Sequence, residues 1–207
     1  MAKPLIVLII TFFLLPLQAA QFEEGKHYKT MEGKALAPQA ELVEFFSYSC
    51  PHCYHAEPLV QDLKKHLSKD VAFQQVPVGF FKPIFELTRI GAIVVETLGK
   101  KDELHSKIFE RIHGKGGSHF RSEEELKAFF AENGISEEEY KRAFASEKAQ
   151  ALHKKYRQET HSSQISGVPS FIVRNKYLVI HNSVKDGKEL AELIQYLAFK
   201  DNQQDKK

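Results

Sequence analysis

Two cysteines, Cys50 and Cys53, are the residues of this sequence best suited to chemistry, and they are the only cysteines among its 207 residues. Pro51 and His52 separate them, so a disulfide between them would close a very small ring. Such a ring removes little conformational entropy from the unfolded chain, and the bond would stabilise the fold poorly. A cysteine pair at this spacing is more typical of redox chemistry or of metal binding.

A zinc site is the alternative that these residues leave open. Structural zinc sites usually combine a cysteine pair with a second pair of cysteines or histidines. The sequence has no second cysteine pair, so the further ligands would be His52 and His55. Because the ligand spacing of known structural zinc sites is absent, the redox interpretation is favoured.

A strand-to-helix junction is predicted around the cysteine pair. Residues 42–46 form a short, mostly apolar run of the kind that a buried central strand shows. Pro51 suits the first position of a helix, where its missing N–H costs nothing. Apolar residues then recur at helical spacing, at Leu59, Val60, Leu63 and Leu67. Cys50 is therefore expected at the N-terminus of a helix, with Cys53 one turn further along.

This placement predicts different chemistry for the two sulfurs. Free backbone N–H groups and the dipole at a helix N-terminus favour negative charge, so the pKa of Cys50 is expected to be low. His52, when protonated, adds a positive charge two residues away. Cys53 is expected to be shielded from solvent and Cys50 to be the exposed, reactive sulfur. A stabilised thiolate favours the reduced protein, so the disulfide form should readily oxidise other thiols.

The remaining sequence predicts one sheet interrupted by a block of helices. Strands are expected at residues 71–78, 171–173 and 177–180, and a last helix at residues 188–199. Residues 83–163 are helical in pattern, with capping boxes at Ser122 and Ser136. Residues 21–40 show no periodicity and are predicted to be irregular. Sequence on both sides of the helical block is needed to complete the sheet, so the block is interpreted as an insertion.

The N-terminus predicts export. Lys3 precedes an almost wholly apolar run at residues 5–17, and Gln18-Ala19-Ala20 offers small residues for cleavage. The run is short for a membrane span, which favours a signal peptide over residues 1–19 and cleavage after Ala19 or Ala20. An uncleaved anchor is the alternative.

The charge of the chain argues against nucleic acid as a partner. Lys and Arg total 29 and Asp and Glu total 27, so no strongly basic face is expected from composition. Residues 201–207 form a polar tail.

The motif Cys50-Pro51-His52-Cys53-Tyr54, with residues 44–47 before it and Gly167-Val168-Pro169 much later, resembles the DsbA family of bacterial periplasmic oxidases. The resemblance covers nearly the whole mature chain. It implies an α/β protein with a thioredoxin fold and an inserted all-helical subdomain. The corresponding segments are residues 20–82 and 164–200 for the thioredoxin-like domain and residues 83–163 for the insertion. It also implies a cis peptide before Pro169, and substrate binding at Val168 and Pro169.

The resemblance also implies roles for two acidic residues. Glu44 matches a buried acid near the active site, and Glu57 matches a second acidic position on the following helix. For Glu57, a solvent-facing helix residue without a role is the alternative. A carboxylate in a central strand should have a raised pKa. Gln75 stands where the family has a lysine, so Glu44 is expected to lack that charge partner. The histidines other than His52 and His55, His105 among them, are expected to be surface or packing residues.

The function implied by the resemblance is that of a periplasmic dithiol oxidase. It would donate the Cys50–Cys53 disulfide to newly exported proteins with free thiols, through a mixed disulfide at Cys50. No cofactor beyond this disulfide is expected, and a DsbB-like membrane protein would restore it.

Two alternatives remain open. A disulfide isomerase or reductase would use the same chemistry, but periplasmic isomerases carry an N-terminal dimerisation domain for which no room is expected before Glu41. A metal-binding chaperone would instead use Cys50 and Cys53 with His52 or His55.

Overall fold

The computed structural model describes residues 22–79 and 83–203. The predicted signal peptide lies outside these residues, as does most of the polar tail. Within the described part of the chain, no helix is both long enough and apolar enough to cross a membrane.

One mixed sheet forms the centre of the protein, with its strands in the order β1-β5-β4-β2-β3. β2 pairs in parallel with β3 and antiparallel with β4, and β5 pairs antiparallel with β4 and β1. The strands are β1 (Tyr28–Thr30), β2 (Glu41–Phe46), β3 (Ala72–Pro77), β4 (Ser170–Val173) and β5 (Tyr177–Val179). β2 therefore lies between β3, which precedes the helical block in the sequence, and β4, which follows it. This is the arrangement that the predicted insertion requires.

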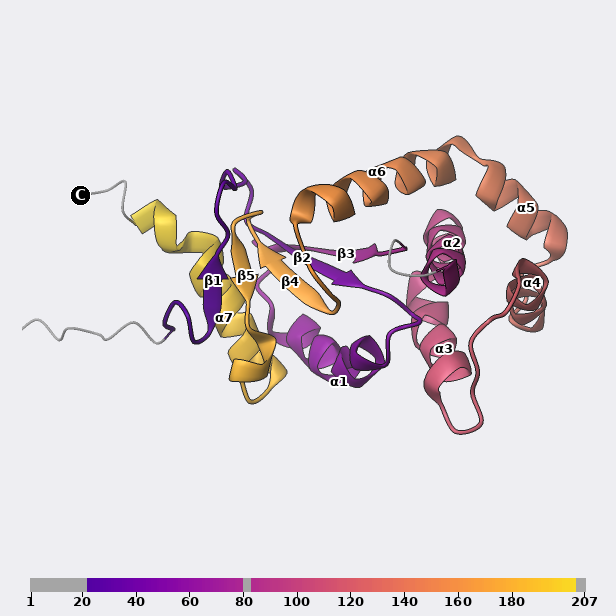
Figure 1. Ribbon diagram of the computed structural model, residues 1–207, viewed down its shortest axis with the longest axis horizontal. Coiled ribbons are helices and arrows are strands. Elements are labelled where there is room, and N and C mark those ends of the chain that lie inside the picture. The colour runs from indigo at the N-terminus through magenta and orange to yellow at the C-terminus, as the bar shows by residue number, and fades with distance from the viewer. Residues whose placement is uncertain (1–21, 80–82, 204–207) are drawn as a thin grey trace, which may run out of the picture.

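Helices cover both faces of this sheet (Figure 1). Successive residues of a strand face opposite sides, so Leu42 on β2 packs against α1 (Pro51–His66) and α7 (Gly187–Phe199), whereas Phe45 faces α6 (Glu147–Ser163). The same alternation places Glu44 on the face of α1. Strand register thus brings a carboxylate to the side of the sheet that carries the cysteine helix.

The predicted helical block is present between β3 and β4. It consists of α2 (Pro83–Thr97), α3 (Lys101–His113), α4 (Glu123–Glu132), α5 (Glu137–Ala145) and α6. The side chains of Ser122 and Ser136 accept hydrogen bonds from the backbone N–H groups of Glu125 and Glu139, which confirms both predicted N-caps. The limits of the inserted subdomain as a domain stay a prediction.

The hairpin of β4 and β5 is confirmed. The prediction of an irregular segment at residues 21–40 was wrong at residues 28–30, whereas most of the other described residues of that segment are irregular. Tyr28–Thr30 forms β1, which pairs with β5 at the edge of the sheet. A strand of three residues is too short to show the alternation from which a strand is predicted.

Gly187, the first residue of α7, lies against the backbone of α1. A Cβ atom there would lie 2.3 Å from the backbone nitrogen of Leu63. We expect Gly187→Ala to destabilise the protein by ~2 kcal/mol or more, because backbone atoms of α1 would have to move. Thermal unfolding monitored by circular dichroism tests this. Gly167→Ala is the control, since no atom lies within 4 Å of a Cβ at that position. Equal midpoints for the two variants would contradict the prediction.

Candidate active site

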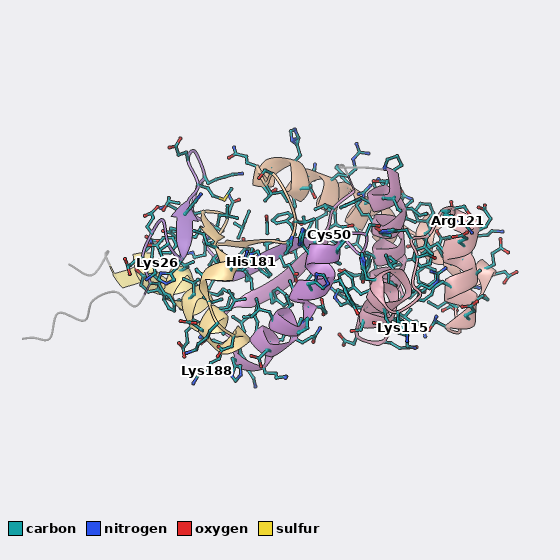
Figure 2. All side chains as sticks on the ribbon, turned by 60° about the horizontal axis from the view of Figure 1, so that its bottom comes forward. Lys26, Cys50, Lys115, Arg121, His181 and Lys188 are labelled. Atoms are coloured by element: carbon teal, nitrogen blue, oxygen red, sulfur yellow. The ribbon has the colours of Figure 1, made fainter. Side chains whose placement is uncertain are left out.

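The cysteine pair lies at the start of α1, as predicted. Cys50 is the N-cap residue, with extended backbone angles, and Pro51 is the first helical residue. The preceding turn is closed by the Cys50 N–H, which donates to the carbonyl of Ser47 at 3.1 Å. Both cysteines are free, so the structure describes the reduced protein. Figure 2 shows Cys50 between the sheet and the helical block.

The prediction that Cys50 is exposed was wrong for this reduced state. Cys50 is 6% exposed and Cys53 is 2% exposed. The loop before β4 lies against Cys50, whose Sγ donates a hydrogen bond to the carbonyl oxygen of Val168 at 3.4 Å. His52 and Pro51, by contrast, are exposed. The sulfur therefore reaches solvent only in part, beside a backbone carbonyl that the sequence places more than a hundred residues away.

The two sulfurs have very different acidities. The pKa of Cys50 is lowered to about 6, chiefly by a hydrogen bond from the Cys53 thiol and further by the backbone N–H groups of Cys53 and His52. The charge of His52 contributes least of these. The low pKa confirms the prediction, but its largest cause is the second cysteine. The helix terminus and His52, which were expected to dominate, have smaller effects.

Cys53 shows the opposite behaviour. Burial raises its pKa far above the usual range, and the bond to Cys50 and the charge of Cys50 raise it further. Of the two thiols, Cys50 therefore ionises near neutral pH while Cys53 keeps its proton. This division suits Cys50 to carry the charge in a thiol–disulfide exchange.

The peptide bond between Val168 and Pro169 is cis, as the resemblance implied. Pro169 directly precedes β4, and Val168 packs against the cluster of buried side chains that includes both cysteines. The structure thus brings together the two sequence motifs, which are far apart along the chain.

Glu44 is buried, with 2% of its surface exposed. Gln75 lies directly opposite on β3 and donates a hydrogen bond to its carboxylate at 2.7 Å. Burial raises the pKa of Glu44 to about 7, against the lowering effect of Gln75, and the charge of Glu57 raises it further. The expected raised pKa is confirmed, and a neutral amide occupies the position facing the acid.

A buried row of polar side chains was missed from the sequence. The Nδ1 atom of His105 lies 2.8 Å from the hydroxyl of Tyr48, and its Nε2 atom lies 3.2 Å from a carboxylate oxygen of Glu57. The interpretation of His105 as a surface or packing residue was therefore incomplete. A signal was present, because His105 shares the apolar face of α3 with Ile108, Phe109 and Ile112, where a polar residue needs a partner.

Metal ligation finds no support in the part of the chain described. Among residues 22–79 and 83–203, no three or more His, Cys, Asp or Glu side chains are grouped so as to hold a metal ion. The alternative of a metal-binding chaperone therefore has no ligand set in these residues.

Comparison with known proteins decides the family. The model of the DSBA-like thioredoxin domain matches residues 41–196, which include both cysteines, Glu44 and Pro169. The chain belongs to the DsbA family. It has the thioredoxin-like α/β fold of that family, with a helical insertion, and it is a thiol:disulfide oxidoreductase.

Relatives from several bacteria resemble most of the chain. The thiol:disulfide interchange protein DsbA of Haemophilus influenzae is 33% identical over 165 residues, 78% of each chain. The crystal structure of Pseudomonas aeruginosa DsbA is 28% identical, with a TM-score of 0.75, and 90% of this chain and 97% of that chain are covered. Proteus mirabilis DsbA, solved with a non-covalently bound peptide PWATCDS, is 24% identical, with a TM-score of 0.76 and coverages of 87% and 100%.

The acidity of Cys50 predicts the pH dependence of its alkylation. We expect the rate of reaction of the reduced protein with iodoacetamide to rise through a midpoint near pH 6, because the thiolate is the reactive form. Peptide mass spectrometry should find the label on Cys50 long before Cys53. His52→Leu should raise the midpoint only slightly, since its charge is the weakest of the causes. His55→Leu, also exposed on α1, is the control. Equal labelling of both cysteines would contradict the assignment.

Glu44 predicts a pH-dependent stability. Its pKa is about 7 in the fold and about 4.3 in an unfolded chain, so ionisation costs stability as the pH rises through this window. Glu44→Gln should therefore stabilise the reduced protein by up to about 3 kcal/mol at pH 8 and hardly at all at pH 4.5. Urea unfolding at both pH values measures this, with the exposed Glu138→Gln as control. A gain that is equal at the two pH values would show that the carboxyl charge is not the cause.

Proposed function

We propose that this enzyme works as an oxidase, which donates the Cys50–Cys53 disulfide to newly exported proteins. The observation that carries the proposal is the separation of the two cysteine pKa values, with that of Cys50 lowered to about 6 and that of Cys53 raised. An ionised Cys50 stabilises the reduced enzyme. The disulfide is correspondingly easy to reduce, and its electrons come from client thiols.

The exchange proceeds in two steps. A client thiolate attacks Sγ of Cys50, the Cys50–Cys53 bond breaks, and its electron pair leaves on Cys53, which takes up a proton. A second client thiolate then attacks the client sulfur of the mixed disulfide and releases Cys50 as a thiolate. Two electrons have passed from the client, which now holds the disulfide, to the enzyme. Cys50 is the better leaving group because its pKa is the lower.

Val168 and Pro169 are the proposed docking point for the client backbone. The carbonyl of Val168 lies 3.4 Å from Sγ of Cys50, so a segment bonded to Cys50 would run beside it. Pro169 lacks an N–H group, which limits pairing of this loop within the sheet. Backbone hydrogen bonds to an extended client would be tolerant of sequence. The peptide seen with the Proteus mirabilis relative agrees with peptide clients.

Re-oxidation is needed after each turnover, because a chain with two cysteines holds one disulfide at a time. We propose a DsbB-like membrane protein as the oxidant and the periplasm as the site of action. The apolar segment at residues 5–17 and the family support both parts of this proposal.

The alternative direction, that of a reductase or isomerase, needs a disulfide that is more stable than those of its clients. A low pKa at Cys50 has the opposite effect. The oxidase direction is therefore the one that the site favours.

Mixing experiments test the direction. The oxidised enzyme and a reduced, unfolded protein with two cysteines should yield enzyme dithiol and client disulfide in equal amounts, measured by thiol trapping and mass spectrometry. Cys53→Ser, first activated as a mixed disulfide of Cys50 with glutathione, should exchange with a reduced client that has one cysteine, release glutathione and keep the client bound at Cys50. Cys50→Ser treated in the same way should bind no client at position 50. An equilibrium in which the enzyme stays oxidised and the client reduced would support a reductase instead.

A further inference from the structure

A row of three hydrogen-bonded side chains joins the helical block to the cysteine helix. Tyr48 is 1% exposed and His105 is 4% exposed, and the side chain of Glu57 is 12% exposed. Tyr48 precedes α1, Glu57 lies on α1, and His105 comes from α3. Burying such a row of polar side chains costs free energy unless they form hydrogen bonds with one another.

The hydrogen bonds fix how the imidazole is used. Neutral His105, protonated at Nε2, donates to the carboxylate of Glu57 and accepts the Tyr48 hydroxyl hydrogen at Nδ1, which satisfies all three groups. The ring is also held by aromatic contacts to Phe46, Tyr48 and Phe109, with centroid distances of 5.4, 5.2 and 5.3 Å. His105 therefore presents a donor to Glu57 from a fixed position.

Glu57 connects this row to the active site. Burial by itself would raise the pKa of Glu57, but the hydrogen bonds from His105 and Gln61 and the charge of Lys64 outweigh it, and the pKa is lowered. The negative charge of Glu57 raises the pKa of Glu44, and the charge of Glu44 raises that of Cys53. A fixed, ionised Glu57 thus favours a protonated Glu44.

We propose that His105 is a positioning residue of the disulfide exchange, which holds the Glu57 carboxylate in place and through it keeps a proton on Glu44 for Cys53. When the disulfide opens, the electron pair leaves on Cys53, and the proton of Glu44 neutralises that sulfur. Only this last assignment rests on the proposed function. The link from His105 to Glu44 holds for either direction of exchange.

Other charged groups act electrostatically on this region, and some of them do so from exposed positions such as Lys64. They act on Glu44, on Tyr48 or on one another, and they are Lys64 on α1, Glu96 on α2 and Lys101 on α3. Lys64 and Lys101 lower the pKa of Glu44, whereas Glu57 raises it. Loss of the hydrogen bond between His105 and Glu57 should therefore lower the pKa of Glu44.

Two variants of matched chemistry separate positioning from packing. His105→Asn keeps a group near Tyr48 but is too short to reach Glu57, whereas His105→Gln places an amide N–H where Nε2 stood. The readout is the titration midpoint of the Glu44 carboxyl, followed by carbon NMR of glutamate-labelled reduced protein and assigned with Glu44→Gln. We expect His105→Asn to lower the titration midpoint of Glu44 by about 0.5 pH units or more. His105→Gln should keep this midpoint near the wild-type value.

The double variant tests whether the effect passes through Glu57. Glu57→Gln alone should also lower the Glu44 midpoint, and adding His105→Asn to it should lower the midpoint no further. An unmoved midpoint in His105→Asn, or an equal shift with and without Glu57→Gln, would overturn the proposal. Oxidation of the reduced client is measured separately with the wild type, so failure of the oxidase proposal leaves this titration result intact.

Discussion

The space at the start of α1 stabilises one negative charge and penalises a second. Cys50 takes that charge, because the Cys53 thiol and two backbone N–H groups point their hydrogens at its sulfur. Cys53 and Glu44 are buried in the same region, and burial raises the pKa of each. The reactivity of Cys50 and the protonation of Cys53 and Glu44 therefore have one cause, which is that this buried region stabilises one negative charge and disfavours a second.

The register of the sheet strands determines which side chains lie in this region. Glu44 faces α1 because it shares the side of β2 with Leu42, and parallel pairing with β3 sets Gln75 opposite it. A lysine at that position would neutralise the acid, whereas the Gln75 amide hydrogen-bonds to it without adding charge. Glu44 consequently titrates near pH 7, within the range where a proton can be gained or lost during turnover.

Local sequence predicted the cysteine helix, the hairpin and the two serine N-caps, because each depends on residues within a few positions of one another. It failed where distant segments meet. Cys50 is buried partly by Val168, which lies 118 residues further along the chain. His105 on α3, the hydrogen-bond partner of Glu57, lies 48 residues after Glu57. The edge strand β1 forms only because β5 offers it hydrogen bonds.

The packing of side chains shows why the helical block matters to the chemistry. Cys50 and Cys53 belong to a buried cluster that is filled mostly by residues of α2 to α5, such as Leu104 and Phe109. The contact of α1 with α7 belongs to a separate cluster, which holds Leu42, Val60 and Leu193. Leu104 and Phe109 of α3 share the cluster of the two sulfurs, so a shift of α3 would reach the sulfurs directly and would move His105 with it. The block therefore forms one wall of the site where the disulfide is exchanged.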